Sequence, residues 1–106
     1  MDYSILNFKH LLVILNKKSL RSELLRFIEL NEIDLKIKFV DSYYEAALFL
    51  QNELSDPIDF IMLSFEIQNQ KFTDFVEYAH TYLTKNNGQF LEIVNGDIHT
   101  ISLEEN

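Results

Sequence analysis

The stretch PIDFIMLSF, residues 57–65, is the most informative part of this 106-residue chain. From Ile58 to Leu63 every residue is apolar except Asp59, as in a strand that is buried on both faces at the centre of a parallel sheet. The run ends at Ser64, where the chain turns polar. In open α/β sheets, functional groups lie just beyond the carboxyl ends of such strands. Ser64 and the loop of residues 66–71 therefore stand where a site is expected.

Shorter segments on either side of this stretch predict the other strands. Residues 11–15 form a second apolar run, which predicts another buried strand. Residues 35–40 alternate apolar and basic side chains, a pattern typical of a strand at or near a sheet edge with one face in water. Residues 90–94 and 98–101 flank an Asn-Gly dipeptide, the strongest local signal for a β-hairpin, because both residues accept positive φ.

Three amphipathic helices are expected between these strands. The first spans residues 20–31, where Leu25 widens the apolar stripe. The second follows the sequence Ser-Tyr-Tyr-Glu, residues 42–45, which has the spacing of a capping box. The third has apolar residues at helical spacing over residues 72–83 and ends at Asn-Asn-Gly, residues 86–88, through a left-handed backbone.

The expected order of elements is β-α-β-α-β-α-β-β in a single domain, residues 1–106. Alternation of strands and helices favours a three-layer α/β fold, with a mostly parallel sheet, right-handed crossovers and helices flanking the sheet. The C-terminal β-hairpin adds an antiparallel edge.

Composition excludes several classes of protein. The chain has no cysteine, which removes thiol catalysis, thiolate metal sites and disulfides together and agrees with a reducing compartment. No apolar run approaches the ~20 residues of a membrane span, and the N-terminus does not resemble a signal peptide. We therefore expect a cytoplasmic protein that does not enter a membrane.

The net charge of −8 is unevenly distributed. Residues 1–38 have a balance of +2, and residues 39–106 have a balance of −10. Nucleic acid is not expected as a partner, because binding its backbone requires Lys and Arg. The acidic part is either a solvated surface that keeps the protein soluble or a face for a basic protein partner.

From about residue 10 to about residue 96 the chain resembles the receiver domain of two-component response regulators. Three segments carry the resemblance: the strand and following pair LVILNK, residues 12–17; the helix start VDSYYEAALFL, residues 40–50; and the central strand PIDFIMLS, residues 57–64. The resemblance implies a flavodoxin-like fold that is truncated at its C-terminal end, since the family's last helix, strand and lysine have no room before Asn106.

The residues at the family's reactive positions do not fit its chemistry. Its Mg²⁺-binding acidic pair falls on Asn16 and Lys17, and an amide with an ammonium group cannot replace two carboxylates. The phosphoacceptor aspartate falls on Ser64, and the hydroxyl residue after the fourth strand falls near Asn95. The resemblance therefore implies a pseudo-receiver, with no cofactor and no metal.

Other catalytic arrangements find little support in the sequence. Ser64 lacks the flanking glycines of a nucleophile elbow, so a small hydrolase is only a remote alternative. The three histidines have no metal-ligand spacing, and the two glycines cannot build a phosphate-binding loop. We therefore expect a protein that is not an enzyme.

A contact surface is the remaining functional prediction. Tyrosine supplies apolar area with a polar edge and is enriched at interfaces. The candidate residues are Tyr43, Tyr44, Glu66, Asp74, Glu77, Tyr78, Tyr82 and His99. The leading interpretation is a non-enzymatic signalling or regulatory module that acts by protein–protein interaction and forms a homodimer through the C-terminal hairpin. The alternative is an acidic inhibitor or decoy that binds a basic protein surface.

Overall fold

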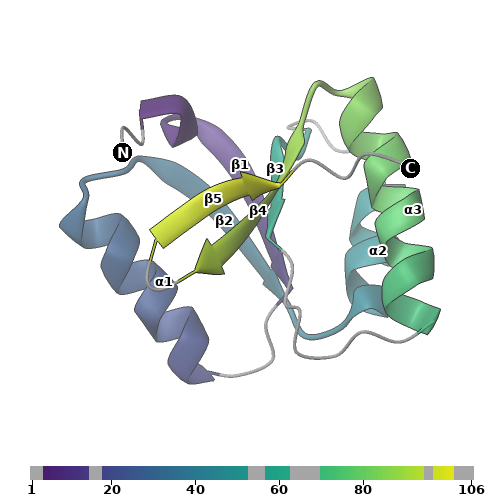
Figure 1. Ribbon diagram of the computed structural model, residues 1–106, viewed down its shortest axis with the longest axis horizontal. Helices are drawn as coiled ribbons and strands as arrows, with labels where there is room; N and C mark the ends of the chain where they lie inside the picture. The colour runs from purple at the N-terminus through teal and green to yellow at the C-terminus, as the bar shows by residue number, and fades with distance from the viewer. Residues whose placement is uncertain (1–3, 15–17, 53–56, 63–69, 95–96, 102–106) are drawn as a thin grey trace.

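The computed structural model in Figure 1 describes residues 4–14, 18–52, 57–62, 70–94 and 97–101. A 3₁₀ turn, η1 (Ser4–Leu6), precedes a five-stranded sheet with the strand order β2-β1-β3-β4-β5. Three helices flank the sheet. The predicted mostly parallel α/β architecture is thus confirmed.

The strand predicted around residues 58–63 is found at the centre of the sheet as β3, residues 60–62. β1 (Lys9–Ile14) pairs in parallel with β2 (Leu35–Val40) on one side and with β3 (Phe60–Met62) on the other. β3 also pairs in parallel with β4 (Gln89–Val94), and β4 pairs antiparallel with β5 (Asp97–Ile101). All three residues of β3 are buried. Three expectations from sequence are met. The apolar strand is central, β2 lies at an edge, and the last two strands pair antiparallel.

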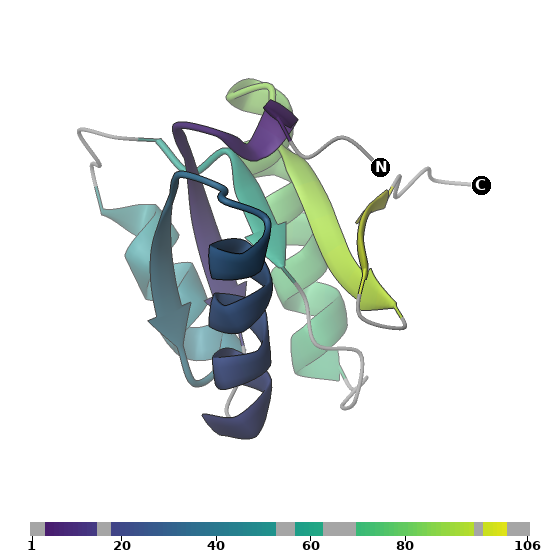
Figure 2. The same cartoon turned by 90° about the vertical axis from the view of Figure 1, so that its left-hand side faces the viewer.

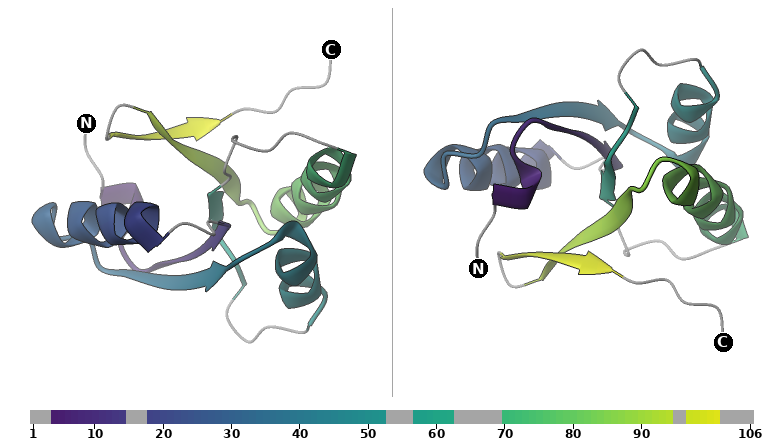
Figure 3. Two further views of the ribbon diagram at one scale, coloured as in Figure 1. Left: turned by 90° about the horizontal axis from the view of Figure 1, so that it is seen from below. Right: turned by 90° about the horizontal axis from the view of Figure 1, so that it is seen from above.

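The helices divide between the two faces of the sheet. α1 (Lys18–Leu30) covers one face, and α2 (Tyr43–Gln51) and α3 (Gln70–Lys85) lie side by side on the other (Figures 1, 2 and 3). The chain moves one way across the sheet from β1 to β2 and the other way from β2 through β3 to β4. Parallel crossovers are right-handed in nearly all proteins, so this reversal explains why the first helix lies on the opposite face from the next two.

Each face of the sheet has its own apolar core. The core under α2 and α3 consists of Leu12, Ile14, Val40, Ala46, Leu50, Ile58, Ile61, Phe75, Ala79, Leu83 and Phe90. The core under α1 consists of Leu6, Leu11, Val13, Leu24, Ile28, Ile33, Phe60, Met62, Leu91 and Ile98. Neighbouring residues of one strand point to opposite faces, so each buried strand contributes to both cores.

Asp59, the one polar residue in the central apolar run, has a structural role. Its carboxylate Oδ2 accepts a hydrogen bond of 2.9 Å from the backbone N–H of His10. Its own N–H donates to the carbonyl of His10 at 2.9 Å, and its carbonyl accepts from the N–H of Gln89 at 3.0 Å. Asp59 therefore joins three neighbouring strands at the amino end of the sheet.

Two of the helices end in Schellman motifs that use non-glycine residues in the left-handed conformation. After α1, Glu32 has a φ of 52°, and the N–H of Ile33 donates to the carbonyl of Ile28 at 3.0 Å. After α3, Asn87 has a φ of 58°, and the N–H of Gly88 donates to the carbonyl of Leu83 at 2.7 Å. The expected left-handed end of the third helix is confirmed, with Asn87 as the left-handed residue.

One core assignment from sequence was wrong. Leu25 was expected to widen the apolar stripe of α1, but its side chain is 47% exposed. Leu24 and Ile28 are buried on the sheet-facing side, and Leu20 and Phe27 pack beside them. No other described α-helix lies on this face, so α1 has no second α-helix against which Leu25 would pack.

Candidate functional site

The residues that the resemblance puts at reactive positions follow three consecutive strands of the sheet, β1, β3 and β4. β1 and β3 pair in parallel, and the strand order reverses between them, which is where open α/β sheets place their ligands. Asn16 and Lys17 follow β1, Ser64 follows β3, and Asn95 follows β4. All four residues lie outside the described ranges. The structure therefore shows that the strands before these residues are neighbours, and it does not describe the residues themselves.

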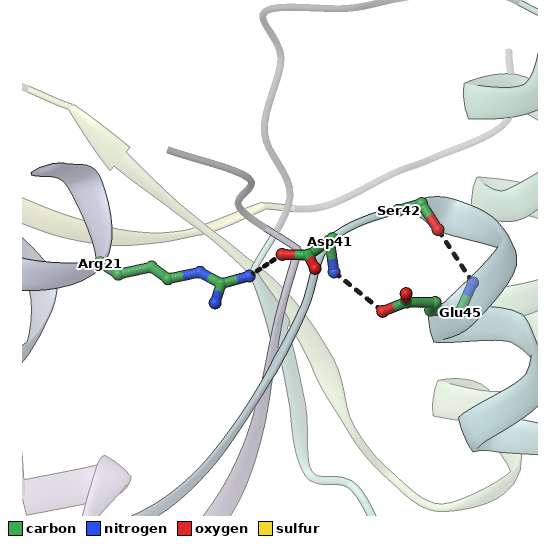
Figure 4. A network of polar contacts seen from close by, with 4 residues as sticks. All are labelled: Arg21, Asp41, Ser42 and Glu45. Carbon is green, nitrogen blue, oxygen red and sulfur yellow. Dashed lines mark hydrogen bonds and ion pairs between the residues drawn. The ribbon is translucent and has the colours of Figure 1, made fainter. Parts of the chain in front are cut away.

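The start of α2 is fixed by a chain of polar contacts (Figure 4). The N–H of Glu45 donates to Ser42 Oγ at 3.1 Å, as expected for an N-cap. The Glu45 carboxylate accepts from the N–H of Asp41 at 3.1 Å, one residue earlier than in a standard capping box. The Asp41 carboxylate in turn forms an ion pair with the guanidinium of Arg21 in α1. These contacts fix where α2 begins and so which way its first residues face.

Two of the four candidate tyrosines pack between elements. The Tyr43 ring stacks on that of Phe75 in α3, with 5.5 Å between the ring centroids. Burial raises the pKa of Tyr43 above its ordinary value, because the ionised phenolate would be poorly solvated there. The hydroxyl of Tyr82 accepts a hydrogen bond of 3.1 Å from the N–H of Ile58, just before β3. Tyr43 and Tyr82 therefore hold α2 and α3 to each other and to the sheet.

The other two tyrosines are exposed on the same pair of helices. Tyr44 is 73% exposed, and Leu48, one turn later in α2, is exposed as well. Tyr78 is exposed in α3, three residues after Phe75, which places it on the side of α3 that faces α2. We call Tyr44, Leu48 and Tyr78 the α2–α3 seam. Leu48 is not among the candidate residues from the sequence, although its spacing of four residues from Tyr44 was a signal that both share a face.

The acidic candidates are less concentrated than the tyrosines. Asp74 and Glu77 are both exposed on α3, one turn apart in the helix. Glu66 lies outside the described residues. His99 is exposed in β5, where it pairs with Glu92 of β4. β5 is the edge strand at the end of the sheet opposite β2. The exposed tyrosines and Leu48 thus belong to the neighbouring helices α2 and α3, whereas His99 belongs to β5.

Two features are absent from the part of the chain that the structure describes. No group of three or more histidine, aspartate and glutamate side chains in those ranges is arranged to hold a metal ion. None of the helices described there has both the length and the apolar character needed to cross a membrane. Comparison of the chain with protein-family models, with curated proteins and with solved structures finds no match.

Proposed function

We propose that this chain is a non-enzymatic signalling or regulatory module of the cytoplasm that acts by protein–protein interaction. The observation that carries the proposal is the α2–α3 seam, where Tyr44, Leu48 and Tyr78 expose apolar side chains on two helices packed against each other. Tyrosine is among the residues that contribute most to binding energy in protein interfaces, because its ring adds contact area at a low cost in conformational entropy.

We also propose a receiver-like identity for the fold. The strand order 2-1-3-4-5 is that of flavodoxin-like sheets, and the first four strands here follow it in parallel. The antiparallel β5 then stands in the place of the fifth parallel strand. Together with Asn16, Lys17 and Ser64 at the reactive positions, this supports a pseudo-receiver that has lost phosphoryl transfer.

Site-specific photo-crosslinking in the native cells tests the proposed interface. A photoreactive phenylalanine derivative is placed at position 44, at position 78 and, as a control, at position 25. Leu25 is a matched control, because it is an exposed apolar residue on α1, on the opposite face of the sheet. The proposal expects the same partner to be captured from positions 44 and 78 and not from 25. Equal capture from all three positions, or none from 44 and 78, would contradict it.

An acidic inhibitor or decoy is the second candidate. The observation that favours it is the pair of exposed carboxylates Asp74 and Glu77 on α3, beside the seam. Binding through charge weakens steeply with salt, whereas binding through tyrosine and leucine does not. A loss of partner binding at high salt, and in a variant with Asp74→Asn, Glu77→Gln and Glu66→Gln, would favour this candidate over the apolar seam.

A homodimer through the C-terminal hairpin also stays a proposal. Its support is that β5 ends the sheet order at one edge, and the opposite edge strand β2 carries Lys36 and Lys38, which discourage strand pairing. Light scattering over a range of protein concentrations measures the mass of the particle. We expect the mass of a dimer for the unmodified chain and the mass of a monomer for the variant His99→Lys. A monomer mass for the unmodified chain at every concentration would remove this proposal.

A further inference from the structure

The strand β2 forms one edge of the sheet in the part of the chain that the structure describes. It stands first in the strand order and pairs only with β1. All six of its residues follow β1 in unbroken register, so β2 has no bulge, and its sequence has no proline. The backbone groups on its outer side point away from the sheet. An edge of this kind is a template for a further strand.

One face of β2 is a row of apolar side chains on the side of α1. Leu35, Ile37 and Phe39 pack against the core under that helix, yet each is only half-buried. Because these residues are two apart in one strand, they point to the same face and form one continuous row. We call them the apolar row. A strand added beside β2 would cover their outer sides.

The other face of β2 carries two lysines on the side of α2. Lys36 and Lys38 are both exposed, and we call them the basic row. The ammonium group of Lys38 lies over the ring of Phe49 in α2, 5.7 Å from the ring centroid. The same ring meets that of His10 in β1 edge to face, with 6.4 Å between the centroids. Phe49 therefore holds the charge of Lys38 beside the strand, on the α2 side of the edge.

The carboxylates nearest in sequence lie at the ends of β2. Asp34 precedes the strand and Asp41 follows it, and residues 35–40 include no acidic side chain. Asp41 already forms an ion pair with Arg21 of α1. A backbone that approaches the outer side of β2 therefore meets the two lysines on one face and the apolar row on the other.

We propose that the outer edge of β2 binds an extended segment of another protein in which Asp or Glu alternates with apolar residues. The segment continues the sheet, with its carboxylates beside the basic row and its apolar side chains beside the apolar row. Lysine on an edge strand discourages pairing with neutral or basic strands, so the basic row also selects an acidic one. This edge is separate from the α2–α3 seam, and its occupation does not depend on the seam.

A second copy of the chain does not fit this edge. In antiparallel pairing about Ile37, Lys36 of each copy lies opposite Lys38 of the other, and about Lys38 the two Lys38 side chains face each other. Like charges directly opposite each other are destabilising. β5 has one carboxylate, Asp97 at its first position, and pairing it with β2 would join unlike edges, which builds rings or filaments. The occupant is therefore a different chain.

The test is a titration of the ¹⁵N-labelled chain, followed by amide NMR, with three short peptides. The first alternates Glu and Val, and the second has Lys in place of Glu. The third repeats the first with every backbone amide N-methylated, so that it cannot donate hydrogen bonds to β2. We expect saturable shifts and slowed hydrogen exchange at residues 35–40 with the first peptide only. The two control peptides require no change in the protein.

Three variants locate the binding site. Lys38→Glu should weaken binding of the Glu peptide about fivefold or more and strengthen binding of the Lys peptide, because the charge opposite each peptide is reversed. Lys85→Glu makes the same change at an exposed lysine at the end of α3 and should leave both peptides unaffected. A variant with Tyr44→Ser and Tyr78→Ser, which removes the seam, should bind the Glu peptide normally.

The opposite results overturn the proposal. Equal binding of the Glu and Lys peptides would remove the charge selection, and equal binding of the N-methylated peptide would show that no strand is added. Shifts confined to residues 44–48 and 74–78, lost in the seam variant, would assign the peptide to the seam. Absence of any saturable shift at residues 35–40 would reject the edge as a binding site and leave the seam to be judged by its crosslinks.

Discussion

Two adjacent residues after α3, Asn87 and Gly88, should respond to substitution with opposite signs. Asn87 is the residue in the left-handed conformation, with a φ of 58°. Gly88 is needed for a different reason, because a Cβ atom there would lie 2.6 Å from the carbonyl oxygen of Asp59 and 2.6 Å from Cδ2 of Leu83. That carbonyl also accepts the N–H of Gln89, which begins β4. Gly88→Ala therefore forces the end of α3 away from the centre of the sheet.

The size of the effect follows from these contacts. Inserting a methyl group into a packed site costs about 1–3 kcal/mol. The smaller conformational freedom of alanine in the unfolded chain returns about 0.4–1 kcal/mol. We expect Gly88→Ala to lower the free energy of unfolding by about 0.5–2 kcal/mol, or the unfolding midpoint by roughly 2–16 °C. Asn87→Gly should be neutral or stabilising by up to about 0.5 kcal/mol, because glycine adopts positive φ without strain.

Urea denaturation followed by circular dichroism measures both variants against the unmodified chain. The reasoning requires a lower midpoint for Gly88→Ala and an unchanged or higher midpoint for Asn87→Gly, with equal slopes. If Gly88→Ala were as stable as the parent protein, or if Asn87→Gly were the destabilised variant, the assigned roles of the two residues would be wrong.

Three further predictions concern the N-cap of α2, the half-buried Tyr43 and the residue before β1. Ser42→Ala removes the acceptor for the N–H of Glu45 and should cost about 1 kcal/mol in urea denaturation; no loss would mean that the cap adds nothing to stability. The raised pKa of Tyr43 means that, as pH increases above about 10, the unfolded chain loses the phenol proton first and stability falls. Tyr43→Phe should make that fall shallower when the free energy of unfolding is measured against pH, and an unchanged slope would contradict the assignment. Phe8→Gly should raise the free energy of unfolding by about 0.5–1 kcal/mol, the strain relieved minus the entropy that glycine adds to the unfolded chain; a destabilised variant would show that the exposed ring supports the fold.

The sheet was predictable from sequence because its strands differ in burial. The run from Phe60 to Leu63 is apolar at consecutive positions, which is typical of a strand that is covered on both faces. Lys36 and Lys38 alternate with apolar residues, which a half-exposed edge strand explains. Periodicity also located the helices, because each needs one apolar face toward the sheet.

The exposed surfaces were harder to predict. Helical periodicity gives the direction of an apolar stripe, but its width depends on which helices lie beside it. Leu25 is exposed because α1 covers its face alone, and Tyr43 is half-buried because Phe75 of α3 stacks on it. Phe8 has a positive φ, which its residue type disfavours. Its N–H donates to the carbonyl of Asp34, a contact between distant parts of the chain that the sequence alone does not indicate.

The candidate site was predicted only in part. The tyrosines were singled out as a group, but sequence cannot separate Tyr43 and Tyr82, which pack between elements, from Tyr44 and Tyr78, which face solvent. Adjacent positions in a helix differ by about 100°, so the difference between Tyr43 and Tyr44 depends on where α3 lies. Leu48 was missed for the same reason.

The central claim is that the chain acts by contact and has no phosphoryl-transfer chemistry. The most direct measurement is an amide NMR spectrum of the labelled protein before and after addition of Mg²⁺ with beryllofluoride, a mimic of an acyl phosphate. The account predicts no saturable shifts at Asn16, Lys17 and Ser64, because two carboxylates and an aspartate are replaced there. Specific, saturable shifts at these residues would mean that the site still binds the metal or the anion, and the claim would be wrong.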